Sequence, residues 1–378
     1  MKEKLAIGFV GPGWIGEVQL KKLLKRADVQ IVAVHSRNQE RTSALLRELG
    51  LPESLYQPSY QELLAQPEIE AIWIASPNDQ HGPQAIAALR AGKHLFCEKP
   101  AAITYRDELT LQTLSHQRPE LISFVDYVLY FNPMEQKLFE MVRSGLLGDL
   151  TQVQVNYRHP INISDHRAWK LRKDVMGDAI SMGINHALSV IYWIFEANGQ
   201  YPTAVYATSE KARTRAFEAD PIWNITISFS GGGTAFCFGN IDFNNGYDAY
   251  HNVTGTKGSF VFDAVQPPTN KVRYSSQDLA GGQWIWPLDS EQCSAKGHNN
   301  HTWDTAITLP DSGDVLNHGL DVAIDCYLKS MRTGTPSPLS LSNSAPIAAI
   351  GWAAQASAIT GERISLPLDS AHMLKLLE

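Results

Sequence analysis

The sequence lacks several features that would place it in a membrane or on a polyanion. Its 378 residues contain no apolar run of the length that spans a bilayer. Only 19% of the residues are charged and the net charge is −7, so no basic surface favours nucleic acid or an anionic membrane. We therefore expect a globular protein that binds neither nucleic acid nor a membrane.

Cysteine is scarce, which argues against a disulfide scaffold and a zinc-binding module. The four cysteines lie far apart: Cys97, Cys237, Cys293 and Cys326. His298 and His301 are three residues apart, but no Cys, Asp or Glu in that segment completes a ligand set, so we expect no metal. Because an apolar strand follows the first few residues, we expect no leader peptide and a cytoplasmic protein.

The length predicts two domains, because one core rarely organises so long a chain. In residues 1–128, apolar runs alternate with helical spacing. The predicted strands are Leu5–Val10, Val29–Val34, Ala71–Ala75, His94–Cys97 and Leu121–Val125. Strands separated by helices favour an α/β fold, with a doubly wound parallel sheet of the Rossmann type.

Residues 129–378 form the second predicted domain, and their pattern differs. Thr151–Arg158 alternates strictly between apolar and polar residues, and Ile222–Phe229 alternates in the same way. Residues 234–243 and 252–262 also have the composition of strands. We predict an α+β domain with a large, mostly antiparallel open sheet.

A glycine pattern between the first strand and the first helix indicates a dinucleotide site. Gly11, Gly13 and Gly16 have the G-x-G-x-x-G spacing, and Trp14 and Ile15 lie between the last two. In this context the glycines allow a tight turn, a close approach to a pyrophosphate and close helix packing. The helix N-terminus supplies N–H groups and a partial positive charge to the phosphates.

The end of the second strand indicates which nucleotide binds. An NAD site usually has an acidic residue there for the ribose hydroxyl. This chain has Ser36 and Arg37, and Arg41 follows one helical turn later. Guanidinium groups pair well with a 2′-phosphate, so we predict NADP, with NAD still possible. The alternative is that both arginines are ordinary solvated charges.

Further motifs resemble those of a known family. Residues 76–81 read SPNDQH, and residues 92–100 read GKHLFCEKP. With the glycine loop, these resemble the Gfo/Idh/MocA family, named after glucose–fructose oxidoreductase and inositol dehydrogenase. The similarity continues through Asn132-Pro133, Ser144–Asp149, Gly255–Ser259 and Gly361–Arg363, and covers essentially the whole chain.

The resemblance implies an oxidoreductase that acts on sugars or cyclitols with NAD(P). It makes Lys99 the catalytic lysine beside the nicotinamide, where burial can lower its pKa toward the working range. It also implies a cis peptide at Pro100 and a homodimer or homotetramer formed through the second domain's sheet. The residues that it places around the cofactor are Ser76, Pro77, Asn78, His81, Glu98, Lys99 and Pro100.

The helix predicted for residues 177–195 departs from the family pattern, which is Asp-x-Gly-x-His. Aligned on Gly183, this chain has Ser181 and Asn185 at the two polar positions, and neither titrates near neutral pH. His186 is one position later, about 100° around an α-helix. Either the helix start shifts and brings His186 inward, or Lys99 handles the proton with help from elsewhere, such as His159.

We predict catalytic roles for Lys99, His186 and Asn185. The predicted substrate contacts are Lys99, Tyr127, Arg158, Trp169, Ser181, Asn185 and His186. The predicted reaction interconverts a hydroxyl and a carbonyl of a sugar, cyclitol or derivative, with Lys99 as the proton relay. Two alternatives remain: an inactive sensor of the same fold, or an enzyme that recycles its bound cofactor during elimination or glycoside cleavage.

Overall fold

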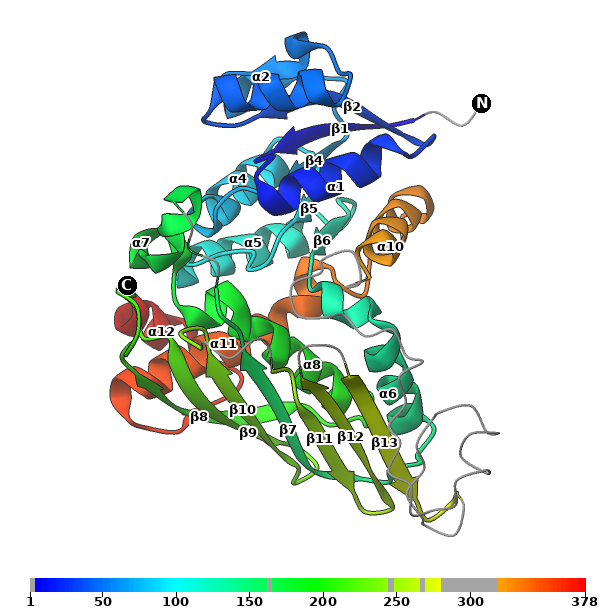
Figure 1. The fold of residues 1–378 in the computed structure, drawn as a ribbon, viewed down its shortest axis with the longest axis vertical. Helices are drawn as coiled ribbons and strands as arrows, with labels where there is room; N and C mark the ends of the chain where they lie inside the picture. The colour runs from blue at the N-terminus through cyan, green and yellow to red at the C-terminus, as the bar shows by residue number, and fades with distance from the viewer. Residues whose placement is uncertain (1–3, 162, 164, 244–247, 266–268, 280–318) are drawn as a thin grey trace. The chain divides into compact units, whose positions relative to one another are not determined.

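The chain forms two compact units in the computed structural model (Figure 1). The structure describes residues 4–161, 163, 165–243, 248–265, 269–279 and 319–378. The first unit comprises residues 1–127, 321–345 and 378, and the second comprises residues 128–320 and 346–377. The sequence-based division at residue 128 therefore needs a correction, because residues 321–345 belong to the first unit.

The first unit is built on a six-stranded parallel sheet with the order β3-β2-β1-β4-β5-β6. Its strands are β1 Leu5–Val10, β2 Val29–His35, β3 Tyr56–Gln57, β4 Ala71–Ile74, β5 His94–Cys97 and β6 Ser123–Val125. Its helices are α1 Trp14–Leu24, α2 Gln39–Glu48, α3 Tyr60–Ala65, α4 Asn78–Arg90, α5 Tyr105–Gln117 and α10 Leu320–Thr333. This confirms the predicted doubly wound sheet, whose strand order reverses between β1 and β4.

Local sequence signals explain where these helices begin. The Asn38 side chain accepts a hydrogen bond from the Arg41 N–H group, and Ser59 accepts one from Glu62. The helix α4 begins at Asn78 and contains Pro83 in its interior. Proline lacks the N–H group that would bond four residues back, yet α4 continues through this position at the loss of one hydrogen bond.

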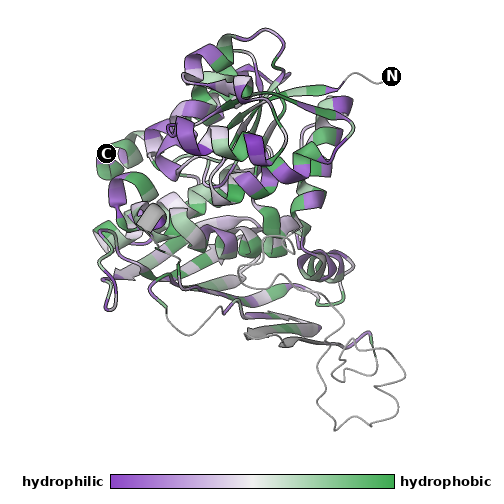
Figure 2. Cartoon of the chain, turned by 45° about the horizontal axis from the view of Figure 1, so that its top comes forward, coloured by the Kyte–Doolittle hydropathy of each residue, from purple (hydrophilic) through white to green (hydrophobic). Residues whose placement is uncertain are grey.

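Aromatic packing explains why α10 belongs to the first unit. Trp73 of β4 stacks on Phe96 of β5, with ring centroids 3.5 Å apart, and Phe124 of β6 stacks on Phe96 at 4.8 Å. Tyr327 of α10 meets all three rings edge-on. Such pairs contribute about 0.5–1.5 kcal/mol each beyond their buried area. In Figure 2, apolar residues fill the strands, and polar residues lie on the outer turns of the surrounding helices.

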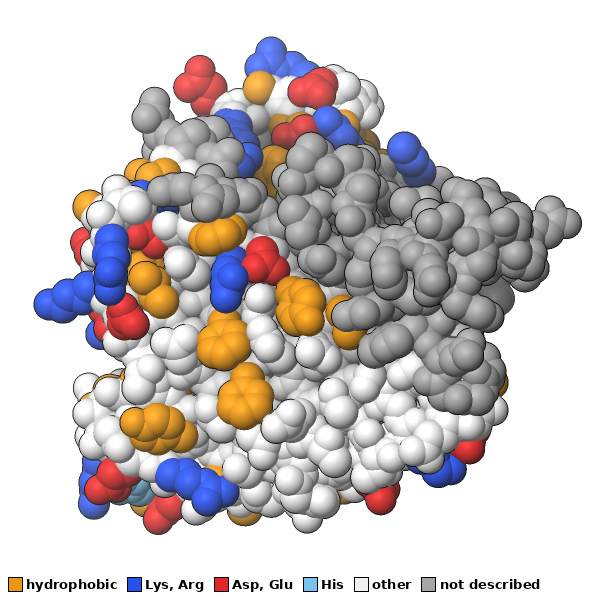
Figure 3. Space-filling model, turned by 60° about the horizontal axis from the view of Figure 1, so that its bottom comes forward, with side chains coloured by type: hydrophobic (Ala, Val, Ile, Leu, Met, Phe, Trp, Pro, Cys, Tyr) orange, Lys and Arg blue, Asp and Glu red, His pale blue; other side chains and the backbone are white. Residues whose placement is uncertain are grey.

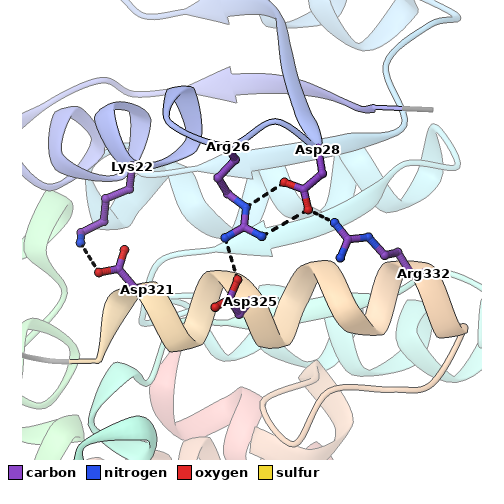
Figure 4. A network of polar contacts seen from close by, with 6 residues as sticks. All are labelled: Lys22, Arg26, Asp28, Asp321, Asp325 and Arg332. Carbon is purple, nitrogen blue, oxygen red and sulfur yellow. Dashed lines mark hydrogen bonds and ion pairs between the residues drawn. The ribbon is translucent and has the colours of Figure 1, made fainter. Parts of the chain in front are cut away.

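Ion pairs also link α10 to the first helix (Figure 4). The ammonium of Lys22 lies 2.6 Å from Asp321, and Arg26 lies 2.6 Å from Asp325. Arg332 pairs with Asp28, which also binds Arg26. The carboxylates of Asp321 and Asp325 are largely exposed, so each pair is worth less than about 1 kcal/mol.

The second unit contains an eight-stranded mixed sheet, β13-β12-β11-β7-β10-β9-β8-β14. Its strands are β7 Leu150–Arg158, β8 Pro202–Glu210, β9 Ile222–Phe229, β10 Thr234–Asn240, β11 His251–Gly255, β12 Gly258–Val265, β13 Thr269–Ser276 and β14 Ile364–Ser365. The β7–β10 pair is parallel and the other pairs are antiparallel, which confirms the predicted mostly antiparallel sheet. Residues 252–262 form parts of two strands separated by the turn at Thr256 and Lys257.

Among the described residues, helices pack on one face of this sheet and none packs on the other, which we call the open face. The helices of this unit are α6 Pro133–Arg143, α7 Lys173–Met176, α8 Asn185–Glu196, α11 Leu341–Thr360, which begins in the first unit, and α12 Ser370–Leu377. On β7, Val153, Val155 and Tyr157 are buried on the face where α8 packs. Within the described residues, no helix is long and apolar enough to cross a membrane.

Candidate active site

The glycine loop joins β1 to α1 and forms a cradle of backbone groups. Gly11 has φ +80°, and a Cβ atom there would lie 2.5 Å from the backbone that follows β4. A Cβ on Gly16 would lie 2.3 Å from a carbonyl oxygen, whereas one on Gly13 would meet nothing within 4 Å. The open side at Gly13 and the first turn of α1, with Trp14 and Ile15, fit a bound pyrophosphate.

The predicted nucleotide-selecting residues follow β2. The Ser36 hydroxyl lies 2.6 Å from the hydroxyl of Thr42 in α2, so it already forms a hydrogen bond within the protein. Arg37 and Arg41 are exposed, and their guanidinium groups form no ion pair with other described residues. Asn38 fixes the Arg41 backbone as the cap of α2, which presents both arginines at the carboxyl end of the strand. The arrangement fits a 2′-phosphate.

The loop after β4 and the first turn of α4 contain four of the predicted cofactor residues, and His81 has a distinct place among them. Its ring lies between two carbonyl oxygens, 2.7 Å from Ser76 and 2.7 Å from Pro100. Burial lowers the pKa of His81, although both carbonyl contacts favour its charged form. His81 is 1% exposed, so it links the two loops from inside. Pro77 precedes α4, and Asn78 is buried in its first turn.

Lys99 follows β5 and precedes a cis peptide bond to Pro100, as the family resemblance implies. Its side chain is half-buried. Burial lowers the pKa of Lys99, and the negative charges of Glu98 and Asp126 act in the opposite direction. A lysine with a lowered pKa can accept and release a proton at a pH closer to neutral than an exposed lysine can. Lys99 is therefore the strongest acid/base candidate in the first unit.

Three buried residues form what we call the acid cluster: Gln19, Glu98 and Asp126. Nε2 of Gln19 donates to Glu98 at 2.7 Å and to Asp126 at 3.2 Å. The Trp73 indole donates to Oε1 of Gln19 at 2.9 Å. The carboxyl group of Glu98 thus points inward to Gln19, whereas the sequence analysis expects Glu98 at the cofactor.

The sequence reasoning missed Gln19 and Asp126, although both carry a signal. Gln19 is polar at a position that shares the buried face of α1 with Gly16, Leu20 and Leu23. Asp126 directly follows the buried strand β6, at the edge of the sheet where parallel strands end. Next to it, Tyr127 is only 4% exposed, and burial raises its pKa. The structure therefore places this predicted substrate contact in the interior of the first unit.

In the second unit, the helix that departs from the family pattern contains a π turn at Ile180–Ile184. The N–H group of Asn185 donates to the carbonyl oxygen of Ile180, five residues back. Such a turn holds one residue more than an α turn. The extra residue lies between Ile180 and Asn185, so it shifts the positions of the following residues around the helix.

Asn185 and His186 have different surroundings. Asn185 is 5% exposed, and its Nδ2 group donates back to the carbonyl oxygen of Ser181 at 3.1 Å. His186 is half-buried, and its ring lies parallel to Tyr157, with centroids 5.8 Å apart and 29° between the planes. Asp178, which the sequence analysis missed, accepts the Ser181 N–H group at 2.7 Å, and burial raises its pKa.

Tyr157, His159 and His186 form what we call the aromatic cluster. The Tyr157 ring contacts both imidazoles: His186 at 5.8 Å and His159 edge-on at 5.9 Å. A Cβ on Gly183 would lie 2.5 Å from the Tyr157 ring, so the glycine allows the ring to pack against the π turn. Burial raises the pKa of Tyr157, so its hydroxyl stays neutral. The cluster combines titratable imidazoles with a hydroxyl group.

The remaining predicted contacts lie apart from this cluster. Arg158 alternates with Tyr157 along β7, so its side chain lies on the opposite face of the sheet, 3.1 Å from Asp248. Trp169 lies in a 3-10 helix, Asp165–Leu171, where the Lys170 ammonium is 5.9 Å from its ring. The described residues contain no metal-binding group of three or more ligands, and His298 and His301 lie outside them.

Comparison with known proteins places this geometry in a family. Residues 5–125 match the model described as "Oxidoreductase family, NAD-binding Rossmann fold", and residues 136–261 match the GFO/IDH/MocA C-terminal domain. An uncharacterized oxidoreductase from Synechocystis sp. is 28% identical over 50% of this chain and 51% of its own length. The chain thus spans about half the length of that curated relative. Inositol 2-dehydrogenase from Salmonella paratyphi B is 26% identical over 67% of this chain and 72% of its own.

Solved structures share the fold at lower sequence identity. Aldose-aldose oxidoreductase from Caulobacter crescentus has a TM-score of 0.77 at 20% identity, and the alignment covers 96% of this chain and 100% of that one. Levoglucosan dehydrogenase in complex with NADH and levoglucosan has a TM-score of 0.76 at 18% identity, over 97% and 100%. The family models and the two-unit architecture together show that this chain belongs to the GFO/IDH/MocA oxidoreductase family.

Proposed function

We propose that the protein is an NAD(P)-dependent oxidoreductase that interconverts a hydroxyl and a carbonyl group of a sugar, a cyclitol or a derivative. The observation that carries this proposal is the half-buried Lys99, which follows β5 beside the buried acid cluster. Relatives named as inositol 2-dehydrogenase and trans-1,2-dihydrobenzene-1,2-diol dehydrogenase support the reaction class. The levoglucosan complex supports a carbohydrate-like substrate.

In this proposal Lys99 handles the proton of the reacting hydroxyl group. In the oxidative direction its neutral amine accepts that proton, and in the reductive direction its ammonium returns it. The backbone cradle at Gly11–Gly16 holds the pyrophosphate, and His81 holds the Ser76 and Pro100 loops in register. The nicotinamide, when bound, supplies the hydride chemistry.

Within the second unit we propose that His186 contacts the substrate and that Asn185 has a structural role. The Asn185 side-chain amide is occupied by its bond to the Ser181 carbonyl oxygen, whereas the half-buried His186 ring lies beside Tyr157, and both observations support this choice. An imidazole can both donate and accept a hydrogen bond from a hydroxyl group near neutral pH. His186 would thus take the part that the family pattern gives to a histidine one position earlier.

For the cofactor we propose NADP in preference to NAD. The exposed guanidinium groups of Arg37 and Arg41 support this, since no acidic residue occupies the end of β2. Charge-assisted bonds from arginine to a phosphate are stronger than those between neutral groups. Complexes of similar folds with NAD and NADH exist, so binding of both nucleotides needs to be measured in parallel.

We also propose a homodimer or homotetramer formed through the open face of the eight-stranded sheet. Tyr206 is 44% exposed, and Phe236 and Phe238 are half-buried on strands whose alternate residues are buried. In Figure 3, apolar side chains lie among atoms of the backbone and of other uncharged residues, with few charged side chains between them. Such a mixture is typical of an interface core. Light scattering of the purified protein measures the assembly.

The direct test is absorbance at the nicotinamide band, with NADP and NAD in parallel, over a panel of cyclitols, aldoses and anhydrosugars. We expect reduction of NADP with at least one substrate and none in Lys99→Met, which keeps the side-chain length. Tight NADPH binding without turnover over the panel would favour an inactive sensor. Substrate cleavage without net NADPH would favour the recycled-cofactor reaction.

A further inference from the structure

The acid cluster contains more acceptors than donors. A carboxylate accepts hydrogen bonds at two oxygens, so Glu98 and Asp126 together present four. The Gln19 amide donates to one oxygen of each residue, and the Lys99 N–H group donates to the second Glu98 oxygen at 3.2 Å. The second oxygen of Asp126, Oδ1, is buried without a partner in the described part of the chain.

The orientation of the Gln19 amide is fixed by Trp73. The indole is a donor only, and it lies 2.9 Å from Gln19 Oε1. The NH₂ group of Gln19 must therefore face the two carboxyl groups. Both Glu98 and Asp126 lie within hydrogen-bond distance of this one nitrogen, so the two carboxyl groups are close neighbours in a buried site.

Two ionised carboxylates at such a distance, out of contact with water, repel each other strongly. One shared proton removes the repulsion and adds the donor that the site lacks. The ionised form of Glu98 is the better stabilised of the two, because Glu98 accepts the shorter hydrogen bond from the Gln19 amide and a second one from the Lys99 backbone N–H group. Within the described part of the chain, the Asp126 carboxyl group accepts only the hydrogen bond of 3.2 Å from Gln19, so the proton is most stable on Asp126.

We propose that Glu98 and Asp126 hold one proton between them, carried by Asp126, and that the remaining single negative charge sets the protonation state of Lys99. Glu98 and Asp126 are then positioning residues, which act on the reaction through Lys99. This inference rests on the proposed role of Lys99 in proton transfer. It assigns a function to Asp126 and Gln19, which lie outside the glycine loop and the Glu-Lys-Pro motif.

The other titratable groups near the cluster leave this charge balance unchanged. Burial raises the pKa of Cys97 well above its usual value, so its thiol is neutral. Burial lowers the pKa of His81, whose ring faces carbonyl oxygens. Burial also raises the pKa of Asp126, and the charge of Glu98 raises it further. The pKa of Glu98 is raised by burial and lowered by Lys99 and Gln19.

The proposal predicts different effects for two isosteric substitutions. Asp126→Asn replaces a neutral acid by a neutral amide that still donates to Glu98, so the charge near Lys99 is unchanged. Glu98→Gln removes the negative charge of Glu98. Burial, the largest cause of the raised pKa of Asp126, still keeps Asp126 neutral in this variant. Lys99 then loses its proton more easily. The double variant should behave like Glu98→Gln alone.

The experiment is pH-dependent acetylation of Lys99 in the intact protein, followed by mass spectrometry, with exposed Lys25 as the internal control. This readout needs no turnover, so it distinguishes failure of this inference from failure of the proposed function. We expect Glu98→Gln to move the labelling midpoint down by about one pH unit or more. We expect Asp126→Asn to leave the midpoint where it is in the wild-type protein.

Three results would overturn the proposal. An equal downward shift in both variants would mean that both carboxyl groups are ionised. A shift of the labelling midpoint in Asp126→Asn alone would place the proton on Glu98. No shift in either variant would show that the two carboxyl groups do not affect the protonation of Lys99. Should a variant fail to fold, the infrared carbonyl band of a protonated carboxylic acid can be sought in wild-type protein with isotope-labelled aspartate. Its absence at neutral pH would also contradict the assignment.

Discussion

The acid cluster of the first unit and the aromatic cluster of the second hold their polar groups by different means. In the acid cluster, hydrogen bonds of 2.7–3.2 Å connect Gln19 of α1 with Glu98 and Asp126, which follow the ends of β5 and β6. In the aromatic cluster, ring contacts of 5.8 and 5.9 Å and a π turn place the two imidazoles. The comparison indicates that hydrogen bonds hold the first cluster together, whereas ring packing and backbone shape hold the second.

The largest effect should follow removal of the Lys99 amine, which lies beside the acid cluster. Lys99→Ala should reduce kcat about 10²–10⁴-fold, since a general acid/base contributes an effect of this size. Its affinity for NADPH, measured by fluorescence titration, should change little, because the glycine loop is intact. A variant that retains wild-type kcat would remove Lys99 from the mechanism.

Substitutions at the π turn test which residue of the aromatic cluster acts. His186→Ala should lower kcat/KM by about 10–100-fold, because it removes the proposed contact with the substrate. Asn185→Ala should cost about 1–3 kcal/mol of unfolding free energy, because it removes the bond to Ser181, with a smaller effect on activity. The reverse pattern would mean that the helix presents Asn185 to the substrate.

Gly183 tests whether the shape of the aromatic cluster matters. Gly183→Ala places a Cβ atom 2.5 Å from Tyr157, which must move, and we expect a loss of about 1–3 kcal/mol of stability and a higher KM. Gly351→Ala in α11 is the matched control, because its nearest contact is 3.3 Å from Ile180. Similar denaturation midpoints for both variants would show that the Tyr157 contact is dispensable.

The cofactor preference should depend on the end of β2. Arg37→Ala and Arg41→Ala should each weaken NADP binding by about tenfold, equivalent to about 1.4 kcal/mol, and leave NAD binding unchanged. Calorimetric titration with both nucleotides measures this. An equal loss for NAD and NADP would show that the arginines do not recognise the 2′-phosphate.

The smallest effect should come from the ion pairs of α10. Asp325→Asn removes the contact with Arg26, and we expect a loss of less than about 1 kcal/mol that decreases further in high salt. Tyr327→Leu, which removes the ring that packs on Trp73, should cost more. Equal losses in thermal unfolding would contradict the view that apolar packing attaches this helix.

The sequence predicts the frame of the first site better than its interior. Strand and glycine patterns are local, so β1, the turn at Gly11 and the place of Lys99 after β5 follow from them. The acid cluster joins α1, β5 and β6, and its contacts depend on strand order and helix placement. Polar residues at buried positions, such as Gln19, are the local sign of such a cluster.

The second site was harder to predict, because one extra residue per turn changes which side chains share a face. The sequence alone left Asn185 and His186 as alternatives. The π turn forms where Gly183 lets Tyr157 pack closely, which is a tertiary effect. The packing of α10 in the first unit also depends on tertiary contacts, because the aromatic partners of Tyr327 lie far from it in the sequence.

The most direct test of the account is the pH dependence of kcat/KM for substrate oxidation with NADP, in wild-type protein and in Lys99→Ala. Because oxidation needs the neutral amine and burial lowers the pKa of Lys99, the wild-type rate should rise with pH below the usual lysine range. The variant should be slow and lack this rise. A wild-type profile that persists in the variant would contradict the assignment of Lys99 as the proton relay.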